Sequence, residues 1–316
     1  MQARVRSPAA CGCATSGARP DASGPRLDVS PAGALGIRVA AGYRIADGKP
    51  IMPLPEHQNP LLLEPSRRQA HGPAQPHESE LDRTPAGLHG QDWAALAQAL
   101  DSQGCGLLPG LLSDAQCDAL AGSYDDAGRF RSRVVMSRHG FGRGEYQYFA
   151  YPLPGLIQGL REQAYPHLVP IANRWNAAMG NPVRYPPTHA GFLRRCHQAG
   201  QARPTPLLLR YGPGDYNCLH QDLYGEHVFP LQIAVLLSRP DSDYTGGEFV
   251  LTEQRPRMQS RVEVVPLNKG DAVVFAVNER PVQGTRGVYR VKLRHGVSRL
   301  RTGQRHVLGV IFHDAA

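Results

Sequence analysis

LLLRYGPGDYNCLHQD, residues Leu207 to Asp222, decides the fold and carries the first two candidate site residues. It reads as an apolar strand that ends in a turn and then delivers His220 and Asp222. Because side chains alternate along an extended chain, two residues separated by one position point to the same face. One strand end can therefore supply a pair of metal ligands.

A second stretch, VKLRHGVSRLRTGQRHVLGVIF from Val291 to Phe312, adds a third candidate metal ligand and an arginine. His295 follows a segment of alternating apolar residues, and Arg305 stands ten positions later at the head of another strand. Two histidines and one carboxylate form the facial triad that binds non-haem iron(II) and leaves positions open for a co-substrate and O2. An arginine can clamp a carboxylate through two charge-assisted hydrogen bonds. Together these groups suit 2-oxoglutarate.

The order His220, Asp222, His295 and Arg305 resembles the iron(II)/2-oxoglutarate dioxygenase superfamily. The segments RYGPG, TGGEF and KGDAVVF are similar to a turn and to middle strands of its prolyl 4-hydroxylase branch. HQDLYG, FPLQ, GGEFVLTEQRPRMQSR and LRHGVS resemble a bacterial oxygenase family purported to act on damaged nucleic-acid bases. The resemblance covers about residues 104 to 314.

This resemblance implies an enzyme, an oxidoreductase that hydroxylates a C–H bond with Fe(II), 2-oxoglutarate and O2, with ascorbate as a further candidate cofactor. The implied site residues are His220, Asp222 and His295 as metal ligands and catalytic residues, and Arg305, Tyr211 and Gln232 as co-substrate-binding residues. Packing in the core is the alternative reading for Tyr211. His227 is a weaker ligand candidate than His220, because His220 has an aspartate at the required offset.

Downstream of Leu207, short apolar segments alternate with turns, whereas helical patterns are confined to the part upstream. This order predicts an α+β fold, a cupin-like jelly roll or double-stranded β-helix with supporting N-terminal helices. The predicted strands span residues 207–211, 231–237, 248–251, 261–265, 272–276, 287–293 and 306–312.

The upstream part predicts three helices and two short strands. The apolar spacing of residues 93–100 indicates a helix, and Ser113 with Gln116 has capping-box spacing for a second helix over residues 114–124. Residues 156–179 read as the longest helical region, interrupted at Pro166 and Pro170. Strands are expected over residues 104–109 and 131–137, and a polar loop over residues 184–203.

An aromatic stretch, GRGEYQYFAYPLP from Gly142 to Pro154, has two readings. Its rings either pack the core or form a substrate lid on which a planar base or peptide ring stacks. The polar segment 184–203 likewise reads as a solvated loop or as a nucleic-acid contact.

Composition divides the chain into an extension, residues 1–89, and a folded part, residues 90–316, which the resemblance implies is an Fe(II)/2-oxoglutarate dioxygenase domain. The extension has no sustained hydrophobic period and is rich in proline, glycine and alanine, so we expect it to be disordered or loosely packed. Two short apolar pieces within it, Leu35 to Val39 and Leu61 to Leu63, are candidates for docking on the domain.

The six cysteines lack paired spacing, so the sequence indicates neither a zinc module nor a disulfide framework. No apolar run is long enough for a signal sequence or a membrane span, which predicts a cytoplasmic protein with reduced thiols.

The net charge of +8 permits an acidic partner such as nucleic acid, but the arginine-rich, lysine-poor composition fits genomic bias equally well. Three functions stay open at this point. The first is oxidative demethylation of alkylated nucleic-acid bases in DNA repair, and the second is hydroxylation of a peptidyl or free amino acid. The third is a non-catalytic cupin-like sensor of metal or 2-oxoglutarate.

Overall fold

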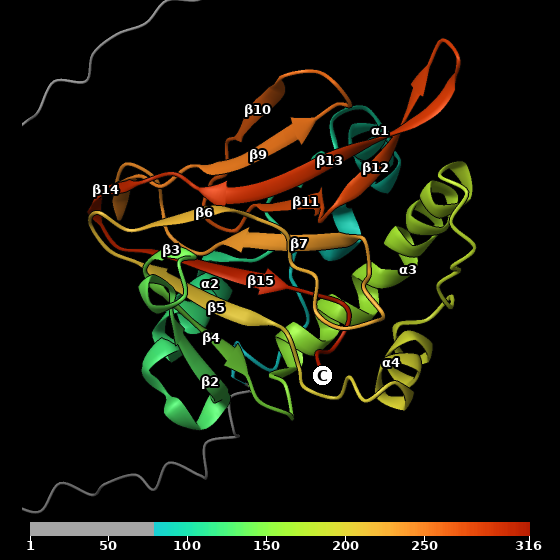
Figure 1. Cartoon of the computed structure of the whole chain (residues 1–316). Coiled ribbons are helices and arrows are strands. Elements are labelled where there is room, and N and C mark those ends of the chain that lie inside the picture. Colours follow the sequence, from blue (N-terminus) through green and yellow to red (C-terminus); the bar gives the residue numbers. More distant parts are fainter. Residues whose placement is uncertain (1–78) are drawn as a thin grey trace, which may run out of the picture. The chain divides into compact units, whose positions relative to one another are not determined.

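A computed structural model of the chain describes residues 79–316 (Figure 1). The earlier residues, including the two apolar pieces predicted to dock, lie outside the described part. Within it, Leu81 and Leu88 are buried in the core, although the sequence analysis assigned them to the extension. The folded part therefore includes residues before the predicted start at 90, and the extent of the extension stays a prediction.

Two antiparallel sheets dominate the fold (Figure 1). The larger sheet has seven strands in the order β1 (Cys105–Leu108), β11 (Ala272–Ala276), β7 (Leu231–Leu236), β15 (Arg305–Val310), β5 (Leu207–Tyr211), β4 (Glu145–Phe149) and β2 (Phe130–Val135). The smaller sheet has the order β10 (Ser260–Val265), β9 (Phe249–Gln254), β13 (Gly287–Val297), β6 (Tyr216–His220) and β3 (Gly142–Arg143), with β12 (Glu279–Gly284) paired to β13. A separate pair joins β14 (Leu300–Gly303) to β8 (Tyr244–Gly246).

Successive strands cross between the two sheets, so that β5, β7, β11 and β15 belong to the larger sheet and β6, β9, β10 and β13 to the smaller one. This connectivity between two sheets is that of a jelly roll. The central strands of the larger sheet, β7, β11 and β15, are buried at every position. The predicted fold class, α+β with a double-stranded β-helix, is confirmed.

Four α-helices precede β5: α1 (Trp93–Gln103), α2 (Asp114–Gly122), α3 (Gly155–Ala178) and α4 (His189–Gln198). Short 3-10 helices occur at Leu88–Gly90, Ser123–Asp125, Ala127–Arg129 and Met136–Arg138. The predicted capping box is present, because Ser113 accepts from the Gln116 backbone and the Gln116 side chain accepts from the Ser113 backbone. Helices α1, α2 and α3 contact strands of the larger sheet and support it.

The predicted interruption of the third helix is wrong, because α3 continues through Pro166 and Pro170. Each internal proline removes one backbone hydrogen bond and costs about 3 kcal/mol. The buried face of α3 includes Leu160, Leu168 and Trp175, all at most 1% exposed. Burial of each such side chain contributes about 1.5–3 kcal/mol, so the packing outweighs the cost of the prolines.

The segment predicted as a polar loop, residues 184–203, contains α4. Thr188 caps this helix by accepting from the Gly191 backbone, and Phe192 and Cys196 anchor it in the core. The sequence analysis missed this helix because its buried face has only a few apolar residues and the segment is rich in arginine.

The aromatic stretch from Gly142 to Pro154 contains β4 of the larger sheet and β3 of the smaller one. Within it β4 pairs with β5 and β2, and Tyr148 and Phe149 are buried. The core-packing reading therefore holds for these two rings.

A buried ion pair fastens the end of the chain to α3. Arg161 and Asp314 are fully buried and joined at 2.9 Å, and Arg161 also donates to the Phe312 carbonyl at 3.0 Å. Tyr151 and His197 complete the set of partners around the Asp314 carboxylate. An uncompensated buried carboxylate is costly, so this network must be satisfied as a unit.

We expect Arg161→Met to lower the free energy of unfolding by about 3–5 kcal/mol, because it leaves the Asp314 carboxylate without its buried cation. Chemical denaturation of the purified protein measures the effect. Arg174→Met on the same helix is the matched control, because the side chain of Arg174 is 54% exposed in its pair with Asp101. The control should cost less than about 1 kcal/mol. Equal losses in the two variants would contradict this account.

Candidate metal centre and co-substrate cavity

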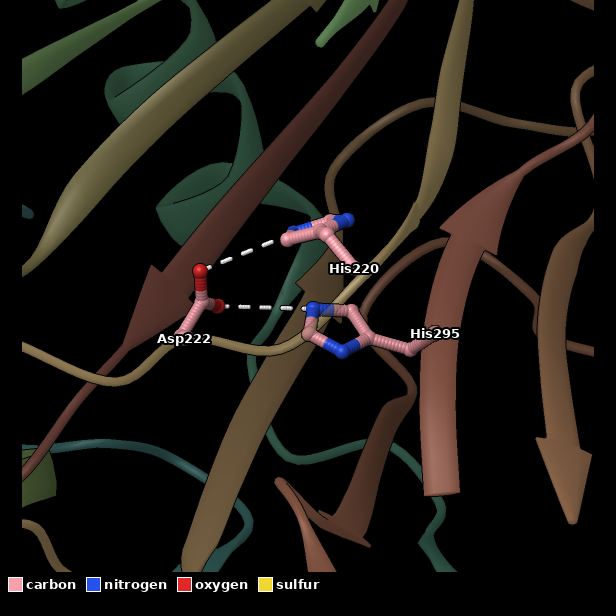
Figure 2. A group of neighbouring side chains, drawn as sticks. All are labelled: His220, Asp222 and His295. Carbon is pink, nitrogen blue, oxygen red and sulfur yellow. Dashed lines mark ion pairs between the residues drawn. The ribbon is translucent and has the colours of Figure 1, made fainter. Parts of the chain in front are cut away.

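Three predicted ligands come together between the ends of two paired strands (Figure 2). His220 is the last residue of β6, and His295 lies opposite it on β13 in the strand register. Asp222 follows just beyond the end of β6, so the strand supplies only one of the two ligands that we predicted from it. One potential ligand atom from each residue lies within 4.8 Å of the others. The set is close enough to hold one metal ion.

The Asp222 carboxylate faces both imidazoles from one side, with one oxygen toward each ring (Figure 2). Its Oδ1 is 3.5 Å from His220 Nε2, and its Oδ2 is 3.4 Å from His295 Nε2. The two rings are 4.2 Å apart between centroids. Two imidazole nitrogens and one carboxylate would bind a metal ion from one side, and the coordination positions on its other side would stay open. This is the arrangement of a facial triad.

The protonation of the ligands suits metal binding. His220 Nδ1 is 2.7 Å from the Cys218 carbonyl, which can only accept, so Nδ1 carries the proton and Nε2 keeps its lone pair. Burial lowers the pKa of His220, and the neighbouring His295 lowers it further. Burial alone would raise the pKa of Asp222, but the hydrogen bond and charge of His295 and the charge of His220 hold it below its usual range. The carboxylate is therefore ionised at neutral pH.

Tyr224 is a site residue that the sequence analysis missed. Its hydroxyl donates to Asp222 Oδ1 at 2.7 Å. Burial, followed by the charge of Asp222, raises the pKa of Tyr224 far above its usual range, so the hydroxyl keeps its proton and stays a donor. Its position two residues after the aspartate was the available signal, because a side chain at that spacing can turn back onto the ligand.

A cavity of about 370 Å³ opens beside the three ligands and runs between the two sheets. Its lining from the larger sheet includes Tyr211, Gln232 and Arg305, and its lining from the smaller sheet includes Phe249 and His295. The predicted ligands and the predicted co-substrate residues therefore border one space.

Arg305 lies in this cavity with its cationic group unsatisfied. The residue is 2% exposed, and its Nε and Nη1 have no hydrogen-bond partner. Within residues 79–316 it makes no ion pair; its nearest π-systems are Tyr211 and Tyr244, at 5.7 and 5.8 Å. A buried guanidinium without an acid is costly, so the cavity is built to receive an anion.

Two further polar atoms in the cavity lack partners, the Tyr211 hydroxyl and Gln232 Oε1. Tyr211 lies opposite Arg305 in the pairing of β5 with β15, and Gln232 projects from β7. The dicarboxylate 2-oxoglutarate would meet the Arg305 cation at one end and the metal ligands at the other. The donors of Arg305 and Tyr211 fit the oxygens of that molecule, which can only accept, and Gln232 would fit them with its amide N–H turned toward the cavity.

The other histidines do not join the cluster. Within the described residues, His220, Asp222 and His295 are the only group of three potential ligands with this proximity. Burial lowers the pKa of His306 and of His313 to about 4, so both are neutral. The backbone N–H of His227 donates to Gln201, and its side chain belongs to no such group.

Several solved structures match the chain at low similarity. A Pseudomonas putida prolyl-4-hydroxylase matches with a TM-score of 0.39 and 15% identity, covering 71% of this chain and 100% of that one. A prolyl hydroxylase from Trichoplax adhaerens in complex with a hypoxia-inducible-factor peptide matches with a TM-score of 0.43 and 15% identity, covering 69% of this chain and 87% of that one.

Sequence similarity is far stronger to an uncharacterized protein of Mycobacterium tuberculosis. The two chains are 50% identical over 168 residues, which is 53% of this chain and 72% of the relative. A family model described as "Oxygenase, catalysing oxidative methylation of damaged DNA" matches residues 144–315, more than half of the chain and all three candidate ligands. The chain therefore belongs to this oxygenase family.

Proposed function

We propose that this oxygenase removes alkyl groups from damaged nucleic-acid bases by oxidation, with Fe(II) held by His220, Asp222 and His295. The C5 carboxylate of 2-oxoglutarate would pair with Arg305, and the Tyr211 hydroxyl and the amide N–H of Gln232 would donate to the co-substrate's oxygens, which can only accept. The observation that carries this proposal is the buried, unpaired Arg305 guanidinium in the same cavity as three converging metal ligands.

When bound, Fe(II) with 2-oxoglutarate and O2 supplies the oxidising power that hydroxylates a C–H bond. The protein's own residues prepare the site for that chemistry. Tyr224 fixes one oxygen of Asp222, and the Cys218 carbonyl fixes the ring of His220, so two ligands are oriented before metal arrives. The apolar walls, including Phe249 and Phe275, keep water from the reacting centre.

The chemistry favours removal of a methyl group over its addition. Methyl transfer needs a methyl donor, whereas hydroxylation of a methyl carbon on nitrogen gives a hemiaminal that releases formaldehyde and leaves the free base. The family description, which names damaged DNA, supports a nucleic-acid substrate for this chain. The net charge of +8 is consistent with an acidic partner.

Two predictions from the sequence stay predictions, ascorbate as an additional cofactor and a cytoplasmic location. Within residues 79–316, no helix combines the length and apolar character needed to cross a membrane.

We expect Tyr224→Phe to weaken metal binding by about tenfold, because outer partners of metal ligands typically contribute 10- to 100-fold to affinity. Titration with Co(II), followed by absorbance, measures this without turnover. Tyr185→Phe is the matched control, since that hydroxyl donates to the Val228 carbonyl away from the ligands. Unchanged affinity in Tyr224→Phe would show that its hydrogen bond to Asp222 does not orient the ligand.

We expect Arg305→Met to weaken 2-oxoglutarate binding about 30-fold or more while leaving the unliganded protein at least as stable, because it removes a buried cation that has no acid partner. Affinity is measured by titration of the Co(II)-loaded protein, and stability by thermal unfolding without ligand. Arg305→Lys should retain part of the affinity through its point charge. Loss of stability in Arg305→Met with unchanged affinity would assign the arginine a structural role.

The substrate class is tested by turnover. Full-length protein with Fe(II) and 2-oxoglutarate is incubated with methylated oligonucleotides or with proline-containing peptides, and succinate and formaldehyde are quantified. We expect equal amounts of both products from a methylated oligonucleotide, and neither from His220→Ala; His227→Ala should retain activity. Succinate formation coupled to peptide hydroxylation, without formaldehyde from any oligonucleotide, would replace the proposed substrate with a peptide.

A further inference from the structure

The two-stranded sheet of β8 and β14 lies outside the two main sheets and next to Arg305. Its register places Gly303, the last residue of β14, opposite Tyr244, the first residue of β8. Only one residue separates the end of β14 from Arg305 at the start of β15. We call residues 243–247 and 299–304 the clasp.

Glycine lets the clasp close tightly. A Cβ on Gly303 would lie 1.9 Å from the Asp243 carbonyl oxygen. A Cβ on Gly247 would lie 2.6 Å from a methyl carbon of Leu300 and 3.1 Å from Arg305 Cδ. The two glycines have φ values of +77° and +67°, which residues with side chains rarely adopt. The clasp backbone therefore packs directly against the stem of Arg305.

Tyr244 is the clasp residue that reaches the Arg305 guanidinium. Its ring centroid is 5.8 Å from Arg305 Cζ, within the distance of about 6 Å over which a ring face attracts a cation. The same Cβ on Gly247 would lie 3.7 Å from Tyr244 Cε2, so the ring and the arginine stem meet over this glycine. Tyr211 of β5 supplies a second ring, at 5.7 Å. Two aromatic rings therefore hold the guanidinium.

The two rings differ in their access to the cavity. Tyr211 is one of the residues that line the cavity. Tyr244 is 7% exposed and is not among the lining residues of the described part of the chain. A co-substrate in the cavity would touch Tyr211 but not Tyr244. Any effect of Tyr244 on that molecule must therefore pass through Arg305.

Neither tyrosine neutralises the cation. Burial raises the pKa of Tyr211 and of Tyr244, and the charge of Arg305 opposes this rise without cancelling it. Both phenols therefore keep their protons at neutral pH. The rings attract the guanidinium without bringing a negative charge that would compete with an incoming carboxylate.

The acid that follows the clasp is bound elsewhere. Glu248 is exposed, and its carboxylate accepts a hydrogen bond from the Ser298 hydroxyl. The Glu248 backbone donates to the same Ser298 oxygen at 3.0 Å. The Ser298 hydrogen bond lowers the pKa of Glu248 more than the charge of Arg305 does. Glu248 is therefore held by Ser298, and Arg305 is left for a ligand.

We propose that Tyr244 is a positioning residue for co-substrate recognition, whose ring holds the unpaired Arg305 guanidinium in the orientation that receives the C5 carboxylate of 2-oxoglutarate. This inference rests on the proposed function, which assigns that carboxylate to Arg305. A long side chain that is free to turn must be ordered when its ligand binds, and this ordering lowers the affinity. The clasp orders Arg305 before the ligand arrives.

The test compares the binding of two 2-oxo acids of equal chain length to the full-length, Co(II)-loaded protein. 2-Oxoglutarate carries the distal carboxylate, whereas 2-oxopentanoate has a methyl group in its place, so the ratio of the two affinities reports the contribution of Arg305. We expect Tyr244→Leu to lower this ratio by about 2- to 12-fold, the cost of ordering one long side chain on binding. The loss should fall on 2-oxoglutarate alone.

Two further variants separate positioning from packing. Tyr244→Phe keeps the ring and should retain the ratio of the unaltered protein. Tyr124→Leu is the matched control, because Tyr124 is also buried and has the Arg210 guanidinium 4.1 Å from its ring centroid, away from the lining of the cavity. This control should leave the ratio unchanged, whatever its effect on stability.

Equal weakening of both acids by Tyr244→Leu would reduce the ring to a packing role. An unchanged ratio, or a loss in Tyr244→Phe as large as that in Tyr244→Leu, would also overturn the inference. An unaltered protein that binds both acids alike would remove this inference together with the assignment of Arg305.

The substrate of the enzyme is a separate question. A lowered ratio in Tyr244→Leu, without turnover of methylated oligonucleotides, would keep the role of Tyr244 and remove the proposed demethylation. Turnover of methylated oligonucleotides with an unchanged ratio would do the reverse.

Discussion

The structure depends on one buried carboxylate that two imidazoles approach from neighbouring strands. Asp222 is 6% exposed, and its ionised form is stabilised by His220, His295 and the Tyr224 hydroxyl. An isolated buried charge of this kind would be costly. The pairing of β6 with β13 offsets that cost, because it brings His220 and His295 opposite each other at the position where the carboxylate turns inward.

The opposite charge lies unpaired in the same cavity. Arg305 is buried on β15 beside Tyr211 of β5, and both sheets must close around it before its guanidinium is removed from water. The fold thus keeps apart a cation on the larger sheet and an anion just beyond the end of β6, both at the same cavity. A site in which a buried cation and a buried anion do not pair with each other is arranged for a ligand that carries the complementary groups.

Much of this arrangement was predictable because it is local in the sequence. His220 and Arg305 stand at strand ends, Asp222 follows β6 and His295 lies within β13. The apolar patterns of the neighbouring strands let the spacing of these residues and the strand order be inferred together. Features set by distant contacts were not predictable. The prolines of α3 read as breaks because nothing local shows how much of that helix is buried, and α4 read as a loop because its core contacts are few.

The aromatic residues show the same limit at the site. Tyr146, Tyr148 and Phe149 attracted attention as a lid because they are adjacent in the sequence, yet β4 carries two of them into the core and only Tyr146 borders the cavity. Phe141, a single aromatic between two glycines, had no such pattern. Its exposure at the mouth follows from the pairing of β3 with β6, a contact across some 75 residues of chain. Surfaces that meet a substrate are under no pressure to show periodicity, because they pack against nothing in the free protein. The metal ligands of such a site are therefore easier to infer from sequence than its exposed surface, since ligands need fixed residue types at a fixed spacing whereas an exposed ring leaves no periodic signal.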